Sequence, residues 1–228
     1  MLALAWLVIS CGSAAPRTVR YETRSQLAAS TPDGLRRIAD SALGGAYVRP
    51  GADLSGYRRV ILRPTEIAPG EPPAPDASAG RGTEESEETK IDRMTRIVDE
   101  AVAGEFARSS AYAVGQDAGP GALLVQPAVL DFVLDTRQLP GGEWSLGGRV
   151  GEMTLVLDVR DAATGQPLAR FVERPDLRLQ TGTGGVTVQG PGPVWSLVHR
   201  AAVRWAQLSR EELDALHQAT IPPLPDPG

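Results

Sequence analysis

Four side chains in this sequence have the chemistry of proton transfer or cation binding. Asp131 and Asp135 lie on the same face of a predicted strand, where two carboxylates can share a proton or hold a cation. His199 and His217 are the only histidines, and His199 lies just beside the apolar stripe of a predicted helix. The alternative is that the two acids are ordinary solvated residues at a strand end, and that the histidines lie on the surface or at the border of a buried helix face. A hydrolase built on these residues is therefore the weakest of three functional hypotheses.

Trp144 lies in the predicted loop PGGEWSLGG, between two glycine pairs. An aromatic side chain in such a loop can contact a protein partner, a glycan or a membrane surface. It can equally fold back and cover the sheet, because a single loop tryptophan has no diagnostic geometry. The first alternative gives the second hypothesis, a periplasmic small-molecule or glycan-binding module.

The sequence lacks the motifs that several enzyme classes require. The nearest approach to a nucleophile elbow, EWSLG at 143–147, has no first glycine, and GTGGVTVQG has the wrong spacing for a phosphate loop. One cysteine and two histidines cannot build a structural zinc site, and Lys90 is the only lysine. The arginines are spread along a chain of net charge −5, which argues against nucleic-acid binding. The sequence therefore predicts no enzyme, no cofactor and no metal.

Cys11 is the only cysteine, and it follows the apolar run of residues 2–9. The letters VISC at 8–11 resemble a bacterial lipobox, in which the cysteine is diacylated, the preceding signal peptide is removed and the new N-terminus is acylated. Two or three acyl chains anchor a protein stably, whereas one holds it only marginally. Gly12 stands where an aspartate would resemble an inner-membrane retention signal, which favours the outer membrane. The alternative is a buried N-terminal strand with an inert cysteine.

Three segments have the residues of a helix. The letters TPD at 31–33 suit an N-cap, a first-turn proline and a first-turn acid, which predicts a short helix to about Leu43. Apolar residues recur every three or four positions over 91–109 and again after Pro193, which predicts two long amphipathic helices. A capping-box pattern at 209–212 predicts a kink or a restart in the last helix.

Strand patterns cover 60–67, 123–134, 150–159 and 168–173, and the turn DAATGQP joins the last two as a hairpin. Pro127 within the second of these predicts a bulge. These elements together predict an α+β fold, a mainly antiparallel sheet of about four to five strands covered by two long helices, with an N-terminal tether.

The stretch AYVRPGADLSGYRRVILRP, the turn DAATGQPL and the helix around Trp205 resemble a family of small bacterial envelope lipoproteins known only as a domain of unknown function, number three-three-one-three. The resemblance covers about residues 46–215. It implies an envelope lipoprotein with an α/β domain and brings no established activity or catalytic residue. Tyr47, Arg49, Asp53 and Tyr57 lie in the matching stretch, where their simplest role is to build the turn into the first strand.

These observations divide the chain into a signal peptide at 1–10, a lipidated tether with a short helix at 11–45, one domain at 46–218 and a proline-rich tail at 219–228. The domain contains an acidic, proline-rich insertion at 68–90. The leading hypothesis is a non-enzymatic binding or accessory lipoprotein, held through acylated Cys11 at the outer membrane and facing the periplasm. Its partner is an unidentified envelope protein or ligand, which Trp144, Tyr57 and Tyr47 are candidates to contact.

Overall fold

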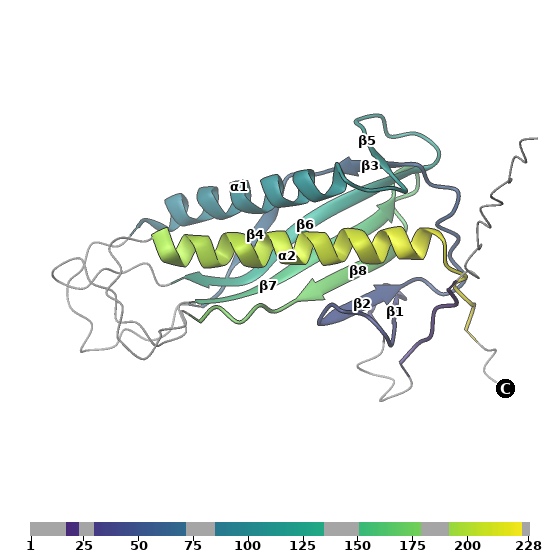
Figure 1. The fold of residues 1–228 in the computed structure, drawn as a ribbon, viewed down its shortest axis with the longest axis horizontal. Coiled ribbons are helices and arrows are strands. Elements are labelled where there is room, and N and C mark those ends of the chain that lie inside the picture. The colour runs from purple at the N-terminus through teal and green to yellow at the C-terminus, as the bar shows by residue number, and fades with distance from the viewer. Residues whose placement is uncertain (1–16, 23–29, 72–84, 135–150, 179–191, 225–228) are drawn as a thin grey trace, which may run out of the picture.

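A computed structural model describes residues 17–22, 30–71, 85–134, 151–178 and 192–224 (Figure 1). Cys11, Asp135, Trp144 and most of the predicted insertion at 68–90 lie outside these ranges, as do the segments 1–10 and 225–228.

Eight strands form one mixed sheet in the order β1-β2-β8-β7-β6-β3-β5, with β4 paired to β6 beyond the end of β3. The strands are β1 (Arg36–Arg37), β2 (Gly45–Val48), β3 (Arg59–Leu62), β4 (Glu66–Pro69), β5 (Ala113–Val114), β6 (Ala122–Leu134), β7 (Gly151–Asp161) and β8 (Pro167–Glu173). The predicted hairpin over DAATGQP is β7–β8, with Asp158 opposite Arg170.

The predicted sheet of four to five mainly antiparallel strands is wrong. Strands β3 and β4 run parallel to β6, and β5 runs parallel to β3. The chain leaves β4, passes through the helix α1 (Glu87–Phe106) and returns in the same direction as β6. A helix between two neighbouring strands is the connection that parallel pairing needs. The remaining extra strands are β1, β2 and β5, which have only two, four and two residues and so are too short to show a clear period in the sequence.

The proline in β6 does not cause the predicted bulge. Pro127 pairs with Leu157 in an unbroken part of the β6–β7 ladder, and the register shift lies further on, between Leu130 and Val133. Val125 accepts a hydrogen bond from Arg63 on the β3 side, so the main chain of Pro127, two residues on, faces the same side. Opposite Pro127 the neighbouring strand is interrupted between β3 and β4. A proline is tolerated at this position because its missing N–H would have had no strand partner there.

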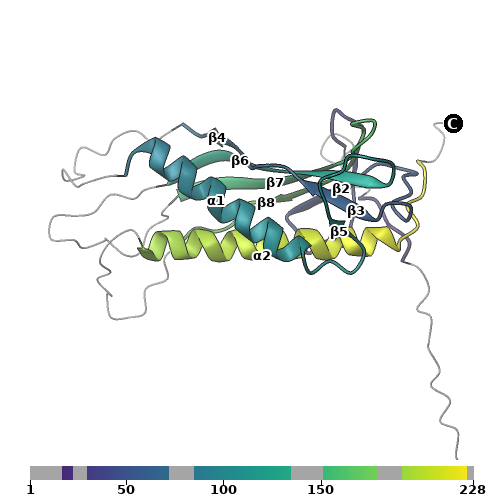
Figure 2. The same ribbon diagram turned by 90° about the horizontal axis from the view of Figure 1, so that it is seen from above.

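Both helices lie side by side on one face of the sheet (Figures 1 and 2). The two predicted long helices are therefore present, as α1 and as α2 (Gly192–His217). The N-cap of α1 is Ser86, which accepts from the Thr89 amide at 3.2 Å. The predicted restart at Ser209 does not occur, because α2 continues through this buried residue.

The hydrophobic core fills the space between the helices and the sheet. Alternate residues of β6 and β7 point toward the helices and are buried, as the period of two in these strands predicts. From the helix side, the core receives the apolar stripes of α1 and α2, in which Met94, Val98 and Trp205 are at most 1% exposed. The opposite face of β7 carries Asp158 and Arg160, which are only partly buried.

The segment 31–43, predicted as a helix, is a tight turn followed by β1. The Leu35 amide donates to the Thr31 hydroxyl at 3.0 Å, and the Gly34 amide donates to the Thr31 carbonyl at 3.0 Å. Gly34 has φ of 84°, a left-handed conformation that favours glycine. The letters PDG are a turn signal of at least equal strength to the N-cap pattern, and here the turn prevails.

The N-terminal ends of the two helices are joined by a cluster that the sequence did not reveal. The Trp195 indole donates to the Glu85 carboxylate at 2.9 Å, and Arg93 pairs with the same carboxylate at 3.3 Å. The Arg93 guanidinium also lies 4.7 Å from the Trp195 ring centroid, a cation–π distance. Glu85, which belongs to the acidic insertion at 68–90, is therefore a structural contact.

At two glycines the chain passes very close to the backbone of β6, at the point where β6 changes register. A Cβ on Gly151 would lie 2.5 Å from the Val133 carbonyl oxygen, and one on Gly70 would lie 2.9 Å from the Asp131 carbonyl carbon. Both contacts are with main-chain atoms, so neither is relieved by a rotamer change.

Replacing Gly151 with alanine is expected to lower the free energy of unfolding by about 1–3 kcal/mol, because the backbone must shift to admit the methyl group. Gly104→Ala is the matched control: its Cβ meets nothing within 4 Å in α1, so alanine should stabilise the protein by roughly 0.5–1 kcal/mol. Urea unfolding followed by circular dichroism measures both. Equal effects of the two substitutions would contradict this account of Gly151.

Candidate functional site

The structure separates the candidate residues of the sequence. Asp131 lies near the end of β6, whereas His217 ends α2 at the other end of the molecule (Figure 1). His199 is exposed on α2. Tyr47 lies in β2 beside Arg37, whose guanidinium is 6.0 Å from the ring centroid. No pair among these residues forms a joint site.

A hollow of about 270 Å³ lies where β6 ends and β7 begins, and Asp131 is one of the residues that line it. It is lined by Gly70, Glu71, Asp131, Val133, Glu152, Met153, Thr154, Arg174 and Pro175. The strands at this end flank the range 135–150, which contains Trp144. This hollow is the candidate binding site of the described chain.

A short chain of hydrogen bonds crosses the hollow. The Arg174 Nε donates to the Thr154 hydroxyl at 3.0 Å, and that hydroxyl donates to the Asp131 carboxylate at 3.3 Å. Arg174 and Asp131 also approach to 3.8 Å, with side chains 77% and 68% exposed. Such an exposed ion pair adds little to stability. Its outward donors and acceptors are therefore available to a polar ligand with hydroxyl groups.

Asp131 has the only positive φ of any non-glycine residue in the described ranges, at 54°. It falls within the register shift between Leu130 and Val133, where the extra residue of a bulge turns the side chain out of the ladder. An aspartate tolerates this left-handed conformation better than most residues. The bulge thus turns Asp131 toward Thr154 and Arg174.

Tyr57 holds the turn between β7 and β8. Its hydroxyl donates to Asp161 Oδ2 at 2.7 Å, while Asp161 Oδ1 accepts from the Ala163 and Thr164 amides at 2.9 and 2.7 Å. Burial, together with this hydrogen bond, raises the pKa of Tyr57 to about 12. The same hydrogen bond lowers the pKa of Asp161. The pair is therefore a neutral phenol and an ionised carboxylate, with each group engaged in holding the turn.

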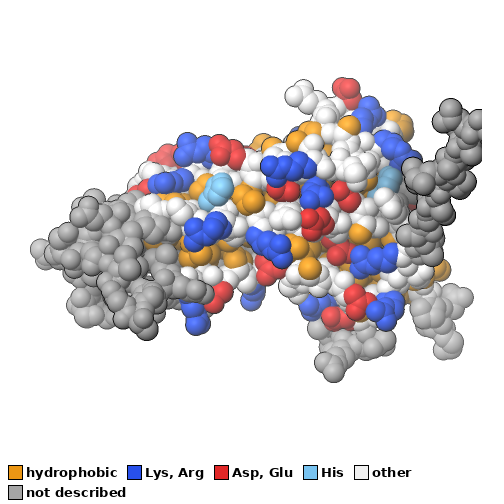
Figure 3. Space-filling view, in the orientation of Figure 1, with side chains coloured by type: hydrophobic (Ala, Val, Ile, Leu, Met, Phe, Trp, Pro, Cys, Tyr) orange, Lys and Arg blue, Asp and Glu red, His pale blue; other side chains and the backbone are white. Residues whose placement is uncertain are grey.

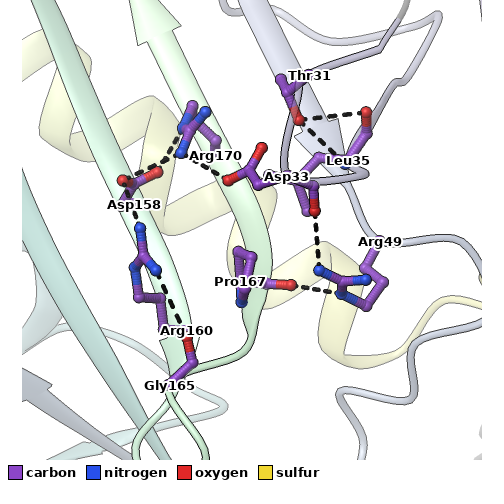
Figure 4. Close-up of polar contacts among 9 residues, drawn as sticks. All are labelled: Thr31, Asp33, Leu35, Arg49, Asp158, Arg160, Gly165, Pro167 and Arg170. Carbon is purple, nitrogen blue, oxygen red and sulfur yellow. Dashed lines mark hydrogen bonds and ion pairs between the residues drawn. The ribbon is translucent and has the colours of Figure 1, made fainter.

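Arg170 on β8 joins two carboxylates on the sheet face opposite the helices (Figure 4). Its guanidinium contacts Asp158 of β7 at 2.5 Å and Asp33 of the N-terminal turn at 2.9 Å. Burial pushes the pKa of Asp33 upward, but the hydrogen bond with Thr31 and the charge of Arg170 outweigh it and hold that pKa below its usual range. The Asp33 carboxylate is thus held in its ionised form beside Arg170, which also pairs with Asp158.

Arg49 attaches the same turn to the hairpin. Its Nε donates to the Pro167 carbonyl at 2.6 Å, and its Nη2 donates to the Asp33 carbonyl at 3.0 Å (Figure 4). Asp53, in the next turn, accepts from the Ser55 amide at 2.8 Å. In the distinctive stretch around these residues, Arg49, Asp53 and Tyr57 each hold a turn or the segment beside it.

His217 is likewise engaged within the fold. Its Nε2 lies 3.0 Å from an Arg58 Nη1, and its Nδ1 lies 3.1 Å from the Leu54 carbonyl. A guanidinium only donates, so we assign the proton to Nδ1, which donates to Leu54. The ring also packs edge-on against Tyr112 with centroids 5.1 Å apart.

In the ranges that the structure describes, no group of three or more His, Cys, Asp or Glu side chains is arranged to hold a metal ion. None of the helices in those ranges is long and apolar enough to cross a membrane.

A family model described as a protein of unknown function (DUF3313) matches residues 24–208. The chain belongs to the DUF3313 family. The family resemblance expected from the sequence is thereby confirmed, and the match covers the sheet from β1 to β8, the helix α1 and most of α2. No curated protein matches the chain.

Solved structures similar to this DUF3313 chain include dodecamers of PelC from Paraburkholderia phytofirmans. One, of a PelC variant, has a TM-score of 0.38 at 12% identity and covers 77% of this chain and 99% of that chain; another has 0.34 at 10%, covering 76% and 96%. A protein from Helicobacter pylori described as a homologue of a neuraminyllactose-binding hemagglutinin has 0.34 at 11%, covering 73% and 91%.

Part of this geometry was accessible to sequence reasoning. The hairpin over DAATGQP brings the strands of Asp158 and Arg170 side by side, although the pairing of these two oppositely charged residues is set by a register shift between Val159 and Arg160. Asp33, Thr154 and Arg174 were missed, because their contacts depend on a long-range turn and on a bulge that no local pattern announces.

Replacing Tyr57 with phenylalanine is expected to lower the free energy of unfolding by about 1.5–3 kcal/mol near neutral pH, because a hydrogen bond to a charged acceptor is lost. The folded-state pKa of Asp161 is depressed, so its contribution is present above about pH 4 and disappears as the pH falls further. The raised pKa of Tyr57 means that its contribution also disappears between about pH 10 and about 12.

Denaturant unfolding of both proteins across this pH range tests the expectation. Tyr47→Phe is the control, since the Tyr47 hydroxyl has no hydrogen bond to another described residue. A Tyr57→Phe deficit that persists unchanged at pH 3 would contradict the assigned ion–phenol pair.

Proposed function

We propose that this protein is a lipid-anchored component of the bacterial cell envelope, attached through Cys11, whose folded part binds or supports a partner without catalysing a reaction. The observation that carries the proposal is the sequence VISC at 8–11, which follows an apolar run and resembles a lipobox. Gly12, in place of an aspartate, supports an anchor in the outer membrane over one in the inner membrane, with the domain facing the periplasm.

The use of polar side chains in the fold supports a non-enzymatic role. Tyr57 with Asp161, Arg170 with its two carboxylates, and His217 with Arg58 each connect separate segments of the chain. A general base or nucleophile needs a free acceptor beside its substrate, whereas these groups are occupied by structural partners.

Replacing Cys11 with serine is expected to abolish labelling by radioactive or alkyne-tagged palmitate and to move the protein from the membrane fraction to the soluble fraction, because serine cannot form the thioether to the lipid. Ser13→Ala is the matched control, since it changes a neighbouring residue outside the lipobox. Unchanged acylation and fractionation of Cys11→Ser would rule out the anchor.

The hollow at Asp131 favours a second candidate function, a periplasmic module that binds a glycan or another small polar molecule. The chain of hydrogen bonds from Arg174 through Thr154 to Asp131 presents donors and acceptors of the kind that sugar hydroxyls use. The range between β6 and β7, which flank this hollow, includes Trp144. Aromatic side chains commonly provide the apolar contact of such sites.

Arg174→Leu is expected to weaken binding of a responding ligand by about tenfold or more, because a hydrogen bond to a charged group is worth about 1.5–3 kcal/mol. Intrinsic fluorescence, titrated with a panel of oligosaccharides and small polar metabolites, is the measurement, and Trp144→Phe should lose the signal. Arg178→Leu is the control, since Arg178 pairs with Asp176 outside the hollow. The absence of any response from the parent protein would count against this candidate.

A further inference from the structure

The folded part of the chain begins very close to Cys11, because residues 17–22 are incorporated into the domain. The Val19 amide donates to the Thr220 carbonyl at 3.0 Å, and the Thr220 amide donates to the Arg17 carbonyl at 2.9 Å. Val19 is 2% exposed in the core, and Arg17 pairs with the buried Glu212 of α2 at 3.2 Å. We call this set of contacts the latch. The N-terminal side of the latch lies within the segment 11–45, which the sequence assigned to a tether and a short helix.

The latch lies at one end of an elongated molecule (Figures 1 and 2). This end, the anchor pole, is formed by residues 17–22, 51–58 and 217–224: Tyr21 donates to the Pro222 carbonyl at 2.7 Å, and the Gly51 amide donates to the same oxygen at 3.1 Å. The opposite end, the far pole, is where α1 and α2 begin and β6 ends, and it includes the Asp131 hollow. The 26-residue α2 spans about 39 Å between them.

We infer that the domain is mounted on the membrane by its anchor pole, so that residues 51–58 and 217–224 face the lipid headgroups and the Asp131 hollow points away from the bilayer. The inference rests on the proposed acylation of Cys11. Six residue steps separate Cys11 from Arg17. Even fully extended they span only about 22 Å, so the anchor pole stays near the bilayer while the far pole is free to swing outward.

The surface of the described residues contains little that would hold the long sides of the domain against the bilayer. Only Val114, Leu130 and Leu224 are large hydrophobic residues with exposed side chains in the described ranges, and Leu224 belongs to the anchor pole. The helix face carries arginine and acidic side chains intermixed rather than a block of one sign (Figure 3). Insertion of a side face would need a contiguous apolar patch, and electrostatic docking would need a basic one.

Energy transfer from the protein to the membrane tests the orientation. The full-length lipoprotein, purified after acylation, is reconstituted into vesicles of phosphatidylethanolamine and phosphatidylglycerol that carry an acceptor dye on their headgroups. Gly56→Cys at the anchor pole and Gly192→Cys at the far pole carry the donor. A Cβ at either glycine meets nothing within 4 Å. Acylation consumes the thiol of Cys11, the only natural cysteine, so each variant has a single reactive thiol.

The donor at Gly56→Cys is expected to transfer energy at least about twice as efficiently as the donor at Gly192→Cys, because α2 alone separates the poles by about 39 Å. Equal transfer, or greater transfer from Gly192→Cys, would overturn the orientation even though the protein is vesicle-bound. If neither variant binds vesicles or takes up palmitate, the anchor itself fails and the orientation falls with it.

Two further variants test the role of the short connection. An insert of about twelve Gly and Ser residues between Ser13 and Ala14 lengthens the tether without touching the fold, and its greatest possible span then rises from about 22 Å to about 65 Å. Arg17→Ser combined with Val19→Ser weakens the latch, so that the attachment point moves on to Tyr21, which donates to the Pro222 carbonyl, and the tether lengthens. Both should lower transfer from the Gly56→Cys donor. Unchanged transfer with the insert would overturn the claim that tether length holds the anchor pole at the membrane.

Discussion

The two-sided pairing of β6 is the constraint on which the rest of the structure depends. This 13-residue strand pairs antiparallel with β7 along one edge and parallel with β3 and then β4 along the other. Its alternate residues supply the centre of the core, with Leu123, Val125 and Val129 fully buried beneath the helices. Pro127 is accommodated within this central strand only because the neighbouring strand is interrupted opposite it. Gln126 closes the interruption by donating its amide to the Pro64 carbonyl at 2.6 Å.

The bulge in β6 connects this core to the candidate site. The strand must keep its buried face toward the helices on both sides of the register shift, as the burial of Val129 and Phe132 shows. The extra residue is therefore absorbed at Asp131, which takes a left-handed conformation and turns toward Thr154. Strained conformations of this type persist only where the surroundings over-determine them, and here the close passage of Gly70 and Gly151 supplies that restraint.

Local sequence patterns anticipated the elements and missed their long-range pairing. The stripes of α1 and α2 and the DAATGQP hairpin were readable, because each depends on residues within a few turns of one another. The parallel pairing of β3 and β4 with β6 was not, since a crossover through α1 leaves no local mark on the strands. At 31–34 two local patterns competed, and the turn prevailed because Gly34 adopts positive φ while Thr31 bonds back to Leu35. Of the residues that line the hollow, the sequence singled out Asp131 alone, as a carboxylate that could share a proton or a cation with Asp135, whereas Arg174 required the fold.

Segments distant in sequence are fastened together at both poles, at the far pole by Trp195 with Glu85, but the two poles differ in the exposure of their polar side chains. At the anchor pole, segments distant in sequence are fastened together: the Arg17 segment to α2, Arg49 to the β7–β8 turn and Tyr57 to Asp161. At the far pole, the side chains of Asp131 and Arg174 are largely exposed, and their mutual attraction is correspondingly weak. A lipid-anchored protein of the proposed kind needs firm attachment of its N-terminal segment to the domain. It also needs accessible polar groups on the surface that binds the partner. The fold places the first at the end nearest Cys11 in the chain and the second about one helix length away.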